Sequence, residues 1–172
     1  DVGDGADARG RVLVKSQDVV MTMLKPWTRA YEKLSADGDV GVRRDATIMH
    51  GHIARASGKS LARVLKGTAM MPSWMKAMSD PNGEVARAAS DAFARTFSTK
   101  ERRSGAIAIA HAEIFDDLGE CLRKKSPADM VFREGSESEQ FGRFERSILA
   151  SLGALANACS RLHDVESADA DA

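Results

Sequence analysis

The side chains best placed to bind a ligand lie in a turn at Asp80–Gly83, which reads DPNG. Carboxylate and amide oxygens bind calcium when a loop supplies them at positions 1, 3 and 5, with Gly at position 6 and Glu at position 12. Counted from Asp80, position 6 is Val85 and position 12 is Asp91, so the spacing does not fit a calcium loop. The pattern instead predicts a helix start, with Asp80 as the cap and Pro81 at the first helical position.

Histidines offer a second kind of chemistry. His50 and His52 are two residues apart, which places them on different sides of a helix, and no cysteine or carboxylate cluster completes a zinc site. They are therefore predicted to be surface or half-buried residues. His111 lies on an apolar stripe, and a hydrogen-bonded core histidine is the favoured interpretation. The alternative is an enzyme that uses His111 as a general base with the acidic run Glu113–Glu120, although that run is better interpreted as a solvated or protein-contact face.

No nucleophile or nucleotide motif is present in the sequence. Cys121 and Cys159 have no local His–Asn signature, and there is no P-loop, dinucleotide glycine fingerprint or G-x-S-x-G motif. The sequence therefore predicts no catalytic residues, no metal ligands and no small-molecule substrate. Two cysteines in 172 residues do not resemble a secreted disulfide framework, which favours a reducing compartment.

Basic side chains are the remaining candidates for a binding function. Lys plus Arg and Asp plus Glu both number 25, which excludes a strongly basic nucleic-acid binder but allows local patches. Scattered basic residues usually form a solvated face, and the alternative is a shallow contact with phosphate or an acidic partner. Both basic clusters are expected along one edge of the folded chain. The predicted partner-binding residues are Arg43, Arg44, Asp80, Asn82, Lys100, Arg102 and Arg103.

The elements that position these residues are predicted to be helices. Apolar residues are 43% of the chain and aromatics only 5%, and no apolar run approaches the ~20 residues that span a membrane. Six stripes at helical spacing are found at Val20–Leu34, Val42–Ile53, Val64–Met78, Val85–Phe97, Ile107–Leu122 and Phe141–Leu162. Pro72 is expected to kink or break the third helix. One domain is predicted over residues 17–163, with disordered ends at 1–16 and in the acidic tail 164–172.

The expected starts and ends of these helices are marked by sequence signals as well. Capping boxes of the form S-x-x-E occur at Ser98–Glu101 and Ser136–Glu139. Gly38 and Gly58 are expected to end helices in the left-handed conformation, and Ser126-Pro127 is expected to start a short extra turn.

A faint internal repeat predicts how the helices are arranged. Trp27 and Trp74 are 47 residues apart, and each is followed by a helical stretch, an Asp-containing turn, and then Val and Arg. This distance lies within the period of about 40–47 residues of HEAT-type helix pairs. The predicted fold is therefore an all-α, HEAT/ARM-like α-solenoid fragment of about three antiparallel helix pairs.

Several segments resemble the N-terminal region of the listerin family, the RING-type ubiquitin-protein ligases of ribosome-associated quality control. The first is LKPWTRAYEKLSADGDVGVRR, with Trp27, Tyr31 and the Val42-Arg43 pair in the family's order. The segments SDPNGEVARAASDAFARTF, EIFDDLGECL and ERSILASLGAL resemble the blocks that follow. The resemblance extends from about Asp18 to Leu162 and is carried by order and spacing.

This resemblance implies a docking function in the cytoplasm. Listerin-type ligases are long HEAT/ARM solenoids whose N-terminal end binds the large ribosomal subunit and the nuclear export mediator factor. A distant C-terminal RING, which holds zinc, recruits the ubiquitin-conjugating enzyme. No counterpart of the RING is found in this sequence, so the segment is expected to dock the ligase, without a cofactor and without carrying out ubiquitin transfer. The alternative is a generic HEAT/ARM-repeat adaptor unrelated to ribosomes.

Overall fold

The structure, a computed structural model, describes residue 19 and residues 22–24, 26–130 and 136–170, and their regular structure is entirely helical. The all-α prediction is confirmed, and no strand occurs in these ranges. The predicted disorder at 1–16 lies outside them. A first helical segment covers residues 22–24 and 26–34. The elements after it are α2 (Val40–Ala56), η1 (Gly58–Ser60), α3 (Leu61–Leu65), α4 (Met70–Met78), α5 (Gly83–Thr96), α6 (Lys100–Ile109), α7 (His111–Lys124), η2 (Pro127–Met130) and α8 (Glu137–Ala170).

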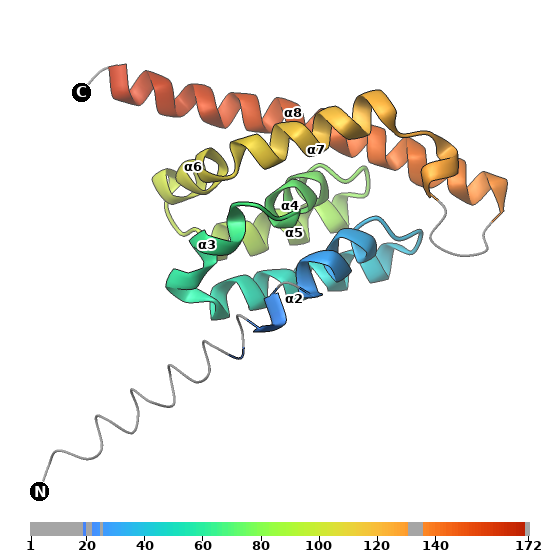
Figure 1. Cartoon of the computed structure of the whole chain (residues 1–172), viewed down its shortest axis with the longest axis horizontal. Helices are drawn as coiled ribbons and strands as arrows, with labels where there is room; N and C mark the ends of the chain where they lie inside the picture. The colour runs from blue at the N-terminus through green and yellow to red at the C-terminus, as the bar shows by residue number, and fades with distance from the viewer. Residues whose placement is uncertain (1–18, 20–21, 25, 131–135, 171–172) are drawn as a thin grey trace, which may run out of the picture.

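The helices are arranged as three pairs in successive layers (Figure 1). The first helical segment packs on α2, α4 packs on α5, and α7 packs on α8, while α2 and α5 lie side by side. Figure 1 shows the short α3 and α6 together at one edge of the molecule. The turns that precede α2 and α5 lie at the opposite edge, which we call the turn edge. Helix α8 continues through most of the stretch for which the sequence predicts a disordered tail.

A run of stacked rings holds the first two pairs together. Tyr31 stacks on His50 with ring centroids 3.8 Å apart, and His50 meets the edge of Trp74 at 4.5 Å. Trp74 then packs edge-on against Phe93 at 5.2 Å, and its indole N–H donates to the Ala89 carbonyl. Because aromatic side chains bury large apolar areas and also prefer these offset geometries, the seam fixes the two layers relative to each other.

The buried face of α2 differs from the one that the sequence predicts. Val42 and Met49 of the predicted apolar stripe are 38% and 52% exposed. The other two residues of that stripe do face the core, but the core-facing side of the helix also carries Arg43, Thr47 and His50. Each of these polar side chains has a hydrogen-bond partner, which is the condition under which polar groups are buried. The polar residues therefore belong to the core, and the prediction that His50 is a surface or half-buried residue is wrong.

Several helix ends also differ from their predictions. The third helix breaks before Pro72, between Leu65 and Met70, so Pro72 lies in the first turn of α4, where its missing N–H costs little. The fifth helix is divided at Ala110 into α6 and α7. Gly58 has the expected positive φ of 52°, whereas Gly38 is not among the positive-φ glycines.

One predicted capping box is confirmed, and at the other the capping residue is shifted by one position. The box at Ser136–Glu139 is reciprocal, because the Ser136 N–H donates to Glu139 at 2.9 Å and the Glu139 N–H to Ser136 Oγ at 3.3 Å. At the start of α6 the cap is Thr99, whose side chain accepts from the Arg102 N–H, one residue later than predicted. The predicted turn after Ser126 is present as η2.

The close approach of α2 and α5 gives the first prediction. A Cβ placed at Gly51 would lie 2.6 Å from the Cβ of Ala92, whereas one at Gly105 in α6 would meet no atom within 4 Å. We expect Gly51→Ala to lower the free energy of unfolding by about 1–3 kcal/mol because the two helices must separate. Gly105→Ala should raise it by about 0.5–1 kcal/mol through helix propensity alone. Urea denaturation measures both values, and the contact is refuted if the two substitutions act in the same direction.

Candidate docking site at the turn edge

The turn before α5 is built by two side chains that bond to the backbone. The Asn82 side chain accepts from the N–H groups of Glu84 and Val85 at 3.0 and 3.4 Å, so Asn82 is the cap of α5. Asp80 accepts from the Asn82 N–H at 2.8 Å. The prediction that Asp80 caps this helix is therefore wrong, because the helix starts two residues later and Asp80 shapes the turn that leads into it.

The turn before α2 uses the same chemistry. Asp37 accepts from the Asp39 N–H at 2.9 Å, and Asp39 accepts from the Val42 N–H at 2.9 Å and caps α2. Asp37 thus corresponds to Asp80, and Asp39 to Asn82. This correspondence in bonding agrees with the internal repeat inferred from the two tryptophan segments.

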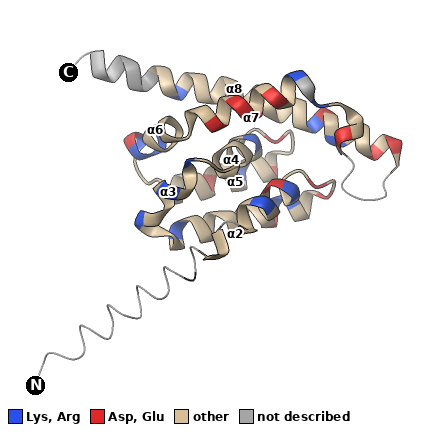
Figure 2. Ribbon diagram, viewed as in Figure 1, with Lys and Arg blue, Asp and Glu red and all other residues tan. Residues whose placement is uncertain are grey.

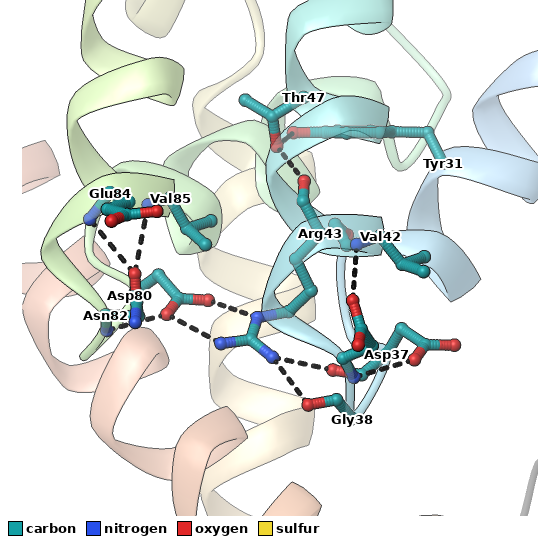
Figure 3. A network of polar contacts seen from close by, with 12 residues as sticks. Tyr31, Asp37, Gly38, Val42, Arg43, Thr47, Asp80, Asn82, Glu84 and Val85 are labelled. Carbon is teal, nitrogen blue, oxygen red and sulfur yellow. Dashed lines mark hydrogen bonds and ion pairs between the residues drawn. The ribbon is translucent and has the colours of Figure 1, made fainter.

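Arg43 joins these two turns (Figure 3). Its Nε and Nη2 donate to the two carboxylate oxygens of Asp80 at 2.8 and 3.2 Å, and its Nη1 donates to the carbonyls of Asp37 and Gly38 at 2.9 and 3.1 Å. The side chains of Arg43 and Asp80 are only 3% and 7% exposed. A two-pronged arginine–carboxylate pair fixes direction as well as distance, so Arg43 sets how the first helix pair lies on the second.

The interior behind this pair is also hydrogen-bonded. The Thr47 hydroxyl donates to the Arg43 carbonyl at 2.8 Å, so its oxygen accepts from the Tyr31 hydroxyl at 3.3 Å. Complete burial raises the pKa of the Tyr31 phenol well above its usual value, which keeps it a neutral donor. The turn edge is thus connected to the aromatic seam.

The predicted partner-binding residues are divided between two edges of the molecule. Figure 2 shows basic residues at the turn edge and, separately, near α3 and α6. Arg44 is partly exposed and pairs with Asp45 at 3.0 Å, close to the turn edge. Arg102 borders a groove with Lys59 at the opposite edge, where Lys100 and Arg103 also begin α6. The expectation that both clusters follow one edge is wrong, because Lys100–Arg103 follow the far end of α5.

The sequence did not single out the basic residues that α8 brings to the turn edge. Arg143 and Arg146 border a pocket there together with Arg43, Lys76 and Lys125. They are distant from Arg43 in the sequence, and their i, i+3 spacing resembles that of any charged helix. Only the packing of α8 on α4 and α7 places them at this edge.

The residues considered for catalysis are not assembled into an active site. His111 is exposed at the start of α7, with its Nδ1 2.8 Å from the Ala108 carbonyl, so the core interpretation of His111 is wrong. In the acidic run, Glu113 accepts from the Gly67 N–H at 2.7 Å, which lowers the pKa of Glu113, and Asp117 pairs with Lys76 at 2.7 Å. These carboxylates therefore join α7 to the α3–α4 connection and to α4.

The described residues provide neither a metal-ligand cluster nor a membrane-spanning helix. No cluster of three or more histidine, cysteine or carboxylate side chains among them could hold a metal ion. None of the helices in the described ranges combines the length and the apolar character needed to cross a bilayer.

Fold and site together define an all-helical domain of paired helices, in which the polar clusters of the described residues join one helix or turn to another. The chain belongs to the family of the N-terminal domain of E3 ubiquitin-protein ligase listerin, whose model matches residues 11–172. It is 30% identical over 149 residues to "E3 ubiquitin-protein ligase listerin" of Gallus gallus, an alignment that covers 86% of this chain. The aligned region is 8% of the chicken protein, so the chain spans less than a tenth of that relative. No solved structure is matched by this chain.

Proposed function

We propose that this chain is the N-terminal docking segment of a listerin-like ubiquitin-protein ligase acting in the cytoplasm. It binds the large ribosomal subunit and the nuclear export mediator factor. The zinc-containing RING of the parent chain then recruits the conjugating enzyme and modifies the nascent chain on a stalled ribosome. The observation that carries the proposal is the family match over residues 11–172. The polar clusters at the turn edge and on α7 are occupied with contacts between helices, which favours a scaffold over an active site at these positions.

We further propose that the three helix pairs are units of a HEAT/ARM-like solenoid. The matching turns at Asp37–Asp39 and Asp80–Asn82 support repeated units. The outer face of α8 supports stacking beyond the third layer, because Phe141, Leu149 and Leu152 are large apolar side chains that lie exposed on it. In a solenoid each unit covers an apolar face of its neighbour, so such a face is the surface on which another helix pair packs.

Co-sedimentation tests the docking role. We expect the chain to sediment with stalled large subunits that carry the nuclear export mediator factor. When it is mixed with small subunits, we expect it to remain in the supernatant. Binding should weaken between about 50 and 200 mM salt if basic side chains contact phosphates. Replacing Arg102 with Glu at the α6 edge should then weaken binding, whereas Lys33→Glu, an exposed change of equal charge, serves as the matched control. Failure to sediment at low as well as physiological salt would reject the proposed function.

A further inference from the structure

A small pocket with excess positive charge lies at the turn edge, where the three helix pairs meet. Its volume is about 70 Å³, enough for a few water-sized groups. Residues from the end of the first helical segment, from α4 and from α8 contribute to its walls. The charged side chains among them are five cations and two carboxylates: Arg43, Lys76, Lys125, Arg143, Arg146, Glu32 and Asp80.

Two of the five cations are already neutralised. Arg43 is held by Asp80, and Lys76 pairs with Asp117 at 2.7 Å. For Lys125, Arg143 and Arg146, no carboxylate of the described residues lies within 4.0 Å. The pocket therefore presents three cations whose charge is not balanced by an ion pair within that part of the chain.

The two arginines of α8 are held in an unfavourable setting. The Nε of Arg143 is buried and has no hydrogen-bond partner among the described residues. Partial burial, and then the positive charge of Arg43, lower the pKa of Arg146. Both observations mean that the protonated guanidinium groups are less well solvated here than on an open surface. An anion in the pocket would supply the missing acceptor and balance the charge.

We propose that this pocket binds one anionic side chain, a carboxylate or phosphoryl group, presented by a protein partner. Guanidinium groups bind such oxyanions through parallel N–H bonds, and the presence of two of them in one small pocket favours a single negatively charged group as the ligand. Ala36 and Ala150 add apolar wall, which suits the narrow aliphatic stem of a side chain. A nucleic-acid backbone carries bulky sugars on both sides of each phosphate, so it fits a pocket of this size poorly. For the identity of the partner, the inference rests on the proposed docking function.

The test is a nuclear magnetic resonance titration of the whole 172-residue chain. The probes are a blocked five-residue Gly/Glu peptide, its Gly/Gln counterpart, a Gly/phosphoserine peptide, and an eight-nucleotide oligouridylate. We expect the Glu and phosphoserine peptides to shift the Nε–H resonances of Arg143 and Arg146 saturably. The Gln peptide should leave these resonances unmoved, and the oligouridylate should bind at least about tenfold more weakly.

Substitutions of the pocket arginines test whether the peptides bind in this pocket. Arg143→Gln with Arg146→Gln should weaken peptide binding about tenfold or more, because a hydrogen bond to a charged group contributes at least that factor. Arg87→Gln with Arg95→Gln removes equal charge from the exposed face of α5 and should leave the affinity unchanged. Without peptide, Arg146→Gln should keep or raise the melting temperature, because it removes like-charge repulsion.

Three results would overturn the inference: equal binding of the Glu and Gln peptides, oligouridylate binding as tight as that of the anionic peptides, or undiminished peptide binding by the folded Arg143/Arg146 variant. The titration contains no ribosomes, so its failure would reject the anion pocket alone. The docking function is decided independently by co-sedimentation.

Discussion

Replacing Arg43 with Met is expected to lower the free energy of unfolding by about 3–5 kcal/mol. The change removes both N–H donors from Asp80, whose side chain is 7% exposed, and leaves a carboxylate buried without its counter-charge. It also removes the donor to the carbonyls of Asp37 and Gly38. Urea denaturation with the midpoint and slope fitted together measures the loss.

The neighbouring arginine provides the matched control. Arg44 has the same side chain one residue later, but it is 43% exposed and pairs with the exposed Asp45. Exposed pairs contribute about 0–1 kcal/mol, so Arg44→Met should cost little. If Arg43→Met were no more damaging than Arg44→Met, the buried pair would not be what joins the first two layers.

A double substitution distinguishes the loss of the ion pair from the cost of leaving one buried charge unpaired. Arg43→Met with Asp80→Asn removes both charges, and the asparagine side-chain oxygen can still accept from the Asn82 N–H. We expect this double variant to be more stable than Arg43→Met alone, because most of the single-variant loss comes from an orphaned buried carboxylate. A double variant as unstable as the two single losses combined would indicate that the two residues act independently.

The sequence predicts the order and approximate positions of the helices well, for a physical reason. Each core-facing helix shows apolar residues every three or four positions, and local signals such as the Ser136–Glu139 box mark a helix start. The division at Ala110 has no such signal, because neither Gly nor Pro occurs between Ala106 and Leu118. Only the tertiary positions of α6 and α7 reveal it.

The face of α2 was mispredicted because periodicity arguments assume that polar residues face water. Arg43, Thr47 and His50 share one face, and each hydrogen-bonds there to a side chain from another segment, although Nε2 of His50 has no partner among the described residues. Those partners, Asp80 above all, are far away in the sequence. A rule based on one helix at a time therefore assigns Val42 and Met49 to the core and these polar residues to the surface.

The candidate site was predicted only in its local part. The repeated turns at Asp37 and Asp80 were visible as a pattern of residues, but the pairing of Arg43 with Asp80 and the approach of Arg143 and Arg146 were not. These contacts depend on how α8 lies across the other helices, and nothing in the spacing of its charges predicts that.

Acidification is expected to destabilise this protein through His50. Its Nδ1 accepts from the Trp27 indole N–H at 3.1 Å, so the ring is neutral and carries its hydrogen on Nε2. The ring is enclosed by Tyr31 and Trp74, and burial lowers the pKa of His50 to about 3. A proton on Nδ1 would face the Trp27 donor, and the charge would lie in an apolar seam without a counter-ion.

The direction of the pH effect follows from linkage. In the unfolded chain a histidine has a pKa of about 6.5, so between pH 6.5 and about 3 the unfolded state binds a proton that the folded state does not. The stability contributed by neutral His50 is fully present above pH 6.5. It is lost as the pH falls, by up to about 1.4 kcal/mol per pH unit. Between pH 7 and 4.5 the loss from this residue should reach about 2–3 kcal/mol.

Two glutamine substitutions isolate this contribution from that of the carboxylates. His50→Gln retains an acceptor for Trp27 but does not titrate, so its free energy of unfolding should fall less steeply with acid than that of the unsubstituted chain. His52→Gln removes an exposed histidine two residues away and should leave the slope unchanged. Urea denaturation at intervals of half a pH unit measures all three profiles. Parallel profiles for the unsubstituted chain and His50→Gln would show that His50 is protonated in the folded state as readily as in the unfolded one, which contradicts its burial in the aromatic seam.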